Sequence, residues 1–60
     1  MTVREWWAQK NRTYKEQVLR ATVPNATLAN ISMWADTSFD FLGATIQQYV
    51  IDAFKKWGSQ

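Results

Sequence analysis

The sequence contains neither cysteine nor histidine, and these two absences exclude several kinds of chemistry. Disulfide bonds, thiol nucleophiles, imidazole acid–base catalysis and zinc sites built from cysteine and histidine all need residues that this chain lacks. Its carboxylates are not accompanied by a candidate base or by a set of metal ligands. We therefore expect no enzymatic activity, no metal and no cofactor.

Long apolar runs are also missing. A helix that spans a bilayer needs about 18 or more consecutive apolar residues, and no stretch approaches that length. The N-terminal segment carries charge at Arg4 and Glu5, which is unlike a secretory signal peptide. The sequence therefore predicts a cytoplasmic protein without a membrane span.

Apolar and aromatic residues, by contrast, are abundant for a chain of 60 residues, which is one domain at most. The hydrophobic fraction is 47%, with four Trp, two Tyr and three Phe. A chain of this size buries only about 60% of the surface that its unfolded form exposes. We expect a partner to cover the excess, most simply a second copy in a homodimer or higher oligomer, and otherwise a protein target or a membrane surface.

The net charge of +2 is small, but the charges are distributed unevenly. Residues 1–20 contain five basic and two acidic side chains, whereas residues 21–54 contain three aspartates and no basic side chain. A solvated helix face explains such a basic segment. The functional alternative is an anionic partner such as nucleic acid.

The N-terminal segment is predicted to be helical. Thr2 and Glu5 have the spacing of a capping box that opens a helix. Trp6 and Trp7 would lie about 100° apart on that helix, so only a concave or two-sided surface could bury both. We expect them to pack this helix onto the rest of the chain, and a protein contact through one of them is the alternative.

Residues 15–23 are compatible with either a strand or a helix. Two sets of three residues alternate here with the period of a strand, namely Leu19, Ala21 and Val23 on one side and Val18, Arg20 and Thr22 on the other. A helix that runs to about Ala21 also fits this pattern. Pro24 excludes a helix that continues through it, and it favours extended backbone at Val23.

Two helical patterns follow the proline. The first would begin at Pro24 or Asn25 and bury an apolar stripe, which consists of Leu28, Ile31, Trp34 and Ala35. Residues 36–38 then interrupt the pattern. The second helical pattern is the strongest in the chain, with one apolar face made of Phe39, Leu42, Ile46, Tyr49, Val50, Ala53, Phe54 and Trp57.

A short strand, a proline, a helix, a break and a longer helix resemble the ribbon-helix-helix family of DNA-binding repressors, typified by Arc and MetJ. The resemblance rests on apolar residues at the fourth, seventh and tenth positions after Pro24, on a small residue at the eleventh, and on the second helix "IQQYVIDAFKKWG". It covers about residues 17–58. It implies an intertwined homodimer formed by residues 17–60, preceded by a helical extension, residues 1–16, in which each chain contributes one strand to a two-stranded ribbon.

The resemblance also implies roles for individual residues in a transcriptional regulator, most simply a repressor. The ribbon would enter the major groove of double-stranded DNA and contact bases through Val18, Arg20 and Thr22. Phosphates would be contacted by Lys10, Arg12, Lys15 and by backbone N–H groups near Phe41 and Leu42, where the second helix would start. The dimer core would contain Leu19, Ala21, Val23, Leu28, Ile31, Trp34, Ile46, Val50 and Phe54.

Two other functions remain open. The helical interpretation of residues 3–21 and the aromatic surplus favour an all-helical hairpin or bundle that binds a protein, such as a small inhibitor or assembly factor. Lys55, Lys56, Trp57 and the number of tryptophans are also compatible with a membrane-active amphipathic peptide. The low net charge and the acidic centre of the chain argue against the membrane-active peptide.

Overall fold

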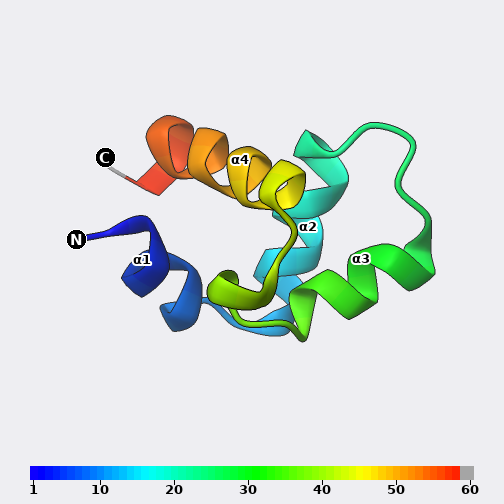
Figure 1. The fold of residues 1–60 in the computed structure, drawn as a ribbon, viewed down its shortest axis with the longest axis horizontal. Helices are drawn as coiled ribbons and strands as arrows, with labels where there is room; N and C mark the ends of the chain where they lie inside the picture. Colours follow the sequence, from blue (N-terminus) through cyan, green and yellow to red (C-terminus); the bar gives the residue numbers. More distant parts are fainter. Residues whose placement is uncertain (59–60) are drawn as a thin grey trace.

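The computed structural model describes residues 1–58 as a series of short helices (Figure 1). In chain order they are α1 (Val3–Gln9), α2 (Arg12–Thr22), α3 (Leu28–Ala35), the 3₁₀ helix η1 (Phe39–Phe41), α4 (Ala44–Ala53) and the π-helix η2 (Phe54–Gly58). This confirms a mainly helical class. No strand occurs within residues 1–58, and no helix there is long and apolar enough to cross a membrane.

The predicted capping box opens α1. The Thr2 hydroxyl accepts a hydrogen bond from the backbone N–H of Glu5 at 3.1 Å, and the Glu5 carboxylate accepts one from the backbone N–H of Thr2 at 2.9 Å. The second of these bonds favours the charged carboxylate, so the pKa of Glu5 lies below its ordinary value. Two backbone donors at the start of α1 are therefore satisfied locally.

The ribbon strand predicted for residues 18–23 is wrong, because residues 18–22 belong to α2. The backbone N–H of Val23 donates to the carbonyl of Leu19 at 2.8 Å, and the Thr22 hydroxyl donates to the carbonyl of Val18 at 2.8 Å. A helix satisfies its own backbone, whereas one strand needs a partner strand to do so. The domain boundary predicted between residues 16 and 17 falls inside α2, so residues 1–16 are not a separate extension.

Pro24 ends a helix instead of a strand. Val23 has extended backbone angles, φ −94° and ψ 112°, as expected for the residue before a proline. Asn25 then adopts a left-handed conformation, φ 60°, which asparagine tolerates better than most residues. α3 starts later than predicted, because the Thr27 side chain caps it by accepting from the backbone N–H of Asn30 at 3.1 Å.

The core is formed within one chain, and α2 packs against both α3 and α4 (Figure 1). α1 closes the core at one end, where it contacts η1, α4 and η2. The buried apolar residues are Trp6, Trp7, Val18, Leu19, Ile31, Ala35, Phe39, Leu42, Ile46, Val50 and Ala53. The stripe predicted from residue 39 onward is thus largely confirmed, although Gly43 interrupts its helix before α4 begins.

Both N-terminal tryptophans are buried, as their packing role requires. The Trp6 ring meets the ring of Tyr14 edge-on at 6.1 Å between centroids, and it lies 5.5 Å from the ring of Phe54. α1 therefore docks onto both α2 and η2 through Trp6. The alternative of a partner contact through Trp6 or Trp7 is wrong for this fold, because neither side chain is accessible.

The residues predicted to form a dimer core divide into three groups in this structure. One chain alone buries Leu19, Ile31, Ile46 and Val50, and it half-buries Val23, Trp34 and Phe54. Ala21 and Leu28, in contrast, are exposed. The helical period turns Ala21 away from the core that a period of two would have assigned to it.

Candidate functional site

The three residues predicted to contact bases do not share a surface. Val18 is only 5% exposed and lies in the core. Thr22 is half-buried, and its hydroxyl donates a hydrogen bond to a backbone carbonyl of its own helix. Arg20 alone is exposed, on α2. The structure does not bring the three side chains together, because a helix separates side chains that a strand would have aligned.

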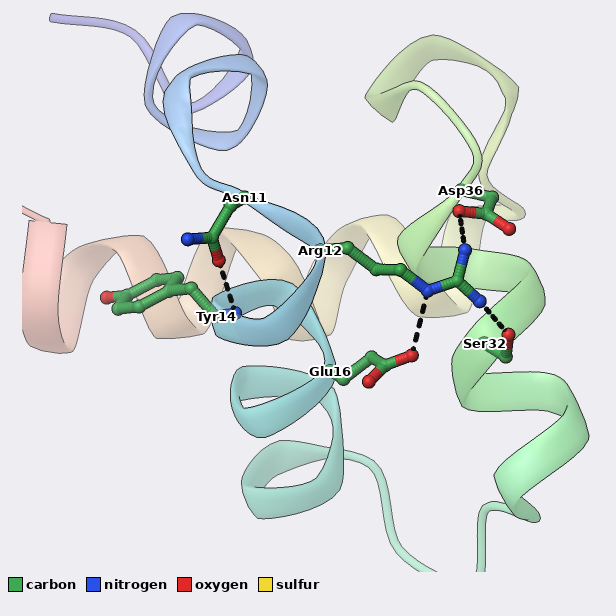
Figure 2. Close-up of polar contacts among 6 residues, drawn as sticks. All are labelled: Asn11, Arg12, Tyr14, Glu16, Ser32 and Asp36. Atoms are coloured by element: carbon green, nitrogen blue, oxygen red, sulfur yellow. Dashed lines mark hydrogen bonds and ion pairs between the residues drawn. The ribbon is translucent and has the colours of Figure 1, made fainter.

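Arg12, predicted to contact phosphate, instead joins α2 to α3 (Figure 2). Its guanidinium forms ion pairs with Asp36, which follows α3, and with Glu16, one turn further along α2, at 3.1 Å in the latter case. A further guanidinium N–H donates to the hydroxyl of Ser32 on α3. The pKa of Arg12 is raised by its hydrogen bonds to Asp36 and Glu16. Three partners hold this charge in place, so Arg12 positions α3.

The other residues predicted to contact phosphates are also engaged or displaced. The Lys10 ammonium stacks over the Tyr14 ring, 5.0 Å from its centroid, and the Lys15 ammonium lies over the Trp7 ring at 5.5 Å. Phe41 and Leu42 precede α4 instead of starting it, since Gly43 is the N-cap residue.

The exposed face of α2 is mainly polar, and an apolar groove lies beside it. Thr13, Gln17, Arg20 and Ala21 are exposed along this face. Beside it lies a hollow of about 260 Å³, which we call the α2–η2 groove. It is lined by Tyr14, Gln17, Val18, Ala21 and Trp57. Two aromatic rings and two aliphatic side chains make its walls mainly apolar.

The exposed part of α3 is uncharged, and Asn30 is its one exposed polar residue among three apolar ones. Leu28 is 71% exposed and Met33 is 54% exposed, and Ala29 lies between them on the helix. No charged residue occurs from Ala21 to Ala35. We call Leu28, Ala29 and Met33 the α3 surface. It remains open because α3 packs mainly against α2.

A second hollow, of about 310 Å³, contains charges of both signs. Its lining residues are Arg4, Trp7, Ala8, Lys15, Asp36, Thr37, Ser38, Phe39 and Asp40. Arg4 pairs with Asp40 at 2.6 Å, and Asp36 pairs with Arg12, so these carboxylates are already neutralised. The indole N–H of Trp7 is buried and has no acceptor among residues 1–58. Because its carboxylates are already paired, we interpret this hollow as part of the contact between α1 and the rest of the chain, and not as a charge-selective binding site.

No protein-family model matches this sequence, and the searches of curated proteins and of solved structures likewise returned no match. The ribbon-helix-helix resemblance thus rests on the spacing of apolar residues alone. Fold and surface chemistry are what bear on function.

Sequence reasoning missed both surfaces. The absence of charge from residue 21 to residue 35 was visible in the sequence and could have indicated the α3 surface. The groove had no comparable indication, because it forms only where Trp57 is brought beside α2, far from it in sequence.

Proposed function

We propose that this chain is a small helical protein-binding module, of the inhibitor or assembly-factor type, and that it contacts its partner through the α3 surface. The observation that carries the proposal is the exposure of Leu28 and Met33 on a helix that has no charged residue. Centres of protein interfaces are depleted of charged side chains and enriched in methionine. A solvated helix face, by contrast, usually carries charge.

The shape of α3 supports the same function. Arg12 bonds to Ser32 and Asp36, so the exposed side chains of α3 are presented on a positioned element (Figure 2). Positioned side chains lose less freedom on binding, which preserves more of the interaction energy. This is the geometry of helix-mediated recognition, in which a few apolar anchors supply most of the affinity.

To test the α3 surface, a photo-crosslinking amino acid is placed at position 33 to identify the partner. The affinity of the chain for that partner is then measured with both proteins purified. We expect Met33→Glu to weaken binding at least about tenfold, because it places a charge in an apolar interface. Thr45→Glu, which adds the same charge at an exposed position of α4, is the control and should bind like the parent. Equal binding by Met33→Glu would contradict the proposal.

Self-association is a separate outcome of that experiment. Crosslinks between two copies, together with a dimer mass in sedimentation that Met33→Glu abolishes, would assign the α3 surface to a homodimer. In that case the predicted oligomer would be correct and the heterologous partner would be wrong.

DNA binding is a second candidate function, now through the outer face of α2. Thr13, Gln17 and Arg20 are exposed there, and these residue types hydrogen-bond base edges and phosphates. The sequence pI of about 9.3 also favours an anionic partner. A helix can enter the major groove as a ribbon can, so the predicted role of Arg20 does not depend on a strand.

This second function predicts that the chain binds duplex DNA with an affinity that falls as salt rises. Arg20→Ala should weaken binding by roughly 1–3 kcal/mol if Arg20 reads a base. Arg20→Lys is the matched control, because it keeps the charge and loses the bidentate geometry. Fluorescence anisotropy with a labelled duplex measures both, and unchanged binding by Arg20→Ala would exclude this face.

A further inference from the structure

The α2–η2 groove depends on an uncommon helical turn. η2 is a π-helix, a conformation that is rare in proteins and occurs frequently at functional sites. It carries Trp57 to the side of α2, where this residue lines the groove together with Tyr14. Gly58 permits this turn, since a Cβ there would collide with the ring of Phe54.

The rims of the groove are basic. The Lys10 ammonium lies 5.0 Å from the centroid of the Tyr14 ring, and the Lys56 ammonium lies 5.0 Å from that of the Trp57 ring. Arg20 is exposed three residues after Gln17, and this spacing makes it a helix-surface neighbour of a residue that lines the groove. No acidic side chain within residues 1–58 lines it. The groove thus combines an apolar floor with positive charge on more than one side.

The size of the groove limits what it can hold. Pockets for drug-sized molecules usually measure about 300–1,000 Å³, and this open groove is slightly smaller at about 260 Å³. One leucine or phenylalanine side chain is a better match, placed against Tyr14 and Trp57. Double-stranded DNA presents no apolar side chain to such a floor, whereas an amphipathic helix does.

We propose that the α2–η2 groove docks an acidic amphipathic helix of a protein partner. A leucine or phenylalanine of that helix occupies the groove, and its carboxylates lie beside Lys10 and Arg20. This contact is independent of the α3 surface, because the two share no residue and α3 does not line the groove. It defines a second interaction surface on the same chain.

The test uses the full chain and two fluorescein-labelled helical peptides with leucines every third or fourth residue. One peptide carries glutamates at the remaining positions, and the other carries lysines there. We expect the glutamate peptide to bind at least about tenfold more tightly than the lysine peptide, and this preference should shrink as salt rises. Ala21→Glu should abolish the preference, because its longer side chain fills the groove and its negative charge opposes the positive charge of the rims. Thr13→Glu, exposed on the same helix outside the groove, should retain most of it.

Three results would overturn the proposal. The first is equal affinity for the two peptides, and the second is unchanged binding by Ala21→Glu while its circular dichroism matches that of the parent. The third is loss of affinity for the glutamate peptide in the Met33→Glu variant, because binding would then use the α3 surface. A DNA duplex and anionic vesicles are also added as competitors of the labelled peptides. If either one binds the chain without releasing a peptide, it uses another surface, and the groove proposal stands.

Discussion

Replacing Trp7 with alanine is expected to unfold most of the molecules. Trp7 is 1% exposed, and truncating a buried tryptophan costs about 3–5 kcal/mol. Domains have roughly 0.05–0.15 kcal/mol of stability per residue, which gives about 3–9 kcal/mol for 60 residues. The loss is therefore comparable with the whole stability of the chain. Urea unfolding followed by far-ultraviolet circular dichroism measures it directly.

Trp7→Phe is the informative companion variant. The indole N–H has no acceptor within residues 1–58, and a buried unsatisfied donor costs about 1–3 kcal/mol. Phenylalanine keeps an aromatic ring and removes this donor, so part of the lost packing is offset. Gln9→Ala, exposed at the end of α1, controls for changes in helix propensity. A Trp7→Ala chain that unfolds at the same urea concentration as the parent would contradict this description of the core.

Val18→Asp is expected to be as damaging as the loss of Trp7, whereas Ala21→Asp is expected to be tolerated. In the helical structure Val18 is buried and Ala21 is exposed, whereas a strand with a period of two would place Ala21 in the core and Val18 outside. Burying an unpaired carboxylate at position 18 should cost more than about 4 kcal/mol. At position 21 the cost should stay near 1 kcal/mol, and it comes mainly from an acid close to the C-terminus of α2.

The order of these two stabilities distinguishes helix from ribbon without a structure determination. Thermal unfolding of both variants, at matched concentration, gives the comparison. A stable Val18→Asp chain together with an unfolded Ala21→Asp chain would restore the strand and the DNA-reading ribbon. Arg20→Asp, adjacent and exposed, controls for the general effect of a new negative charge on α2.

Local rules predicted those parts of the fold that depend on neighbouring residues. Thr2 and Glu5 are three residues apart, and their capping box forms as expected. The apolar stripe from Phe39 onward is buried because its spacing repeats over several turns. Val18 and Leu19 lacked such support, since a segment of nine residues fits two periods. The choice was made by packing against α3 and α4, which the segment itself does not encode.

The candidate site was less predictable because its parts are distant in sequence. Arg12 was assigned to phosphate on account of its charge, but its partners Ser32 and Asp36 lie 20 and 24 residues away. Trp57 reaches α2 only through the π-helical turn of η2, which no residue pattern indicated. Exposed features such as Leu28 and Met33 become informative only once the neighbours of α3 are known.

The way in which α3 is attached has a consequence for its response to salt. The buried side chains of Ile31 and Ala35 hold α3 in the core, and an exposed ion-pair network centred on Arg12 supplements that contact. Exposed ion pairs contribute little free energy and are screened as salt rises, whereas apolar burial is not weakened in this way. The α3 surface should therefore keep its place on the molecule at salt concentrations that abolish charge-dependent binding.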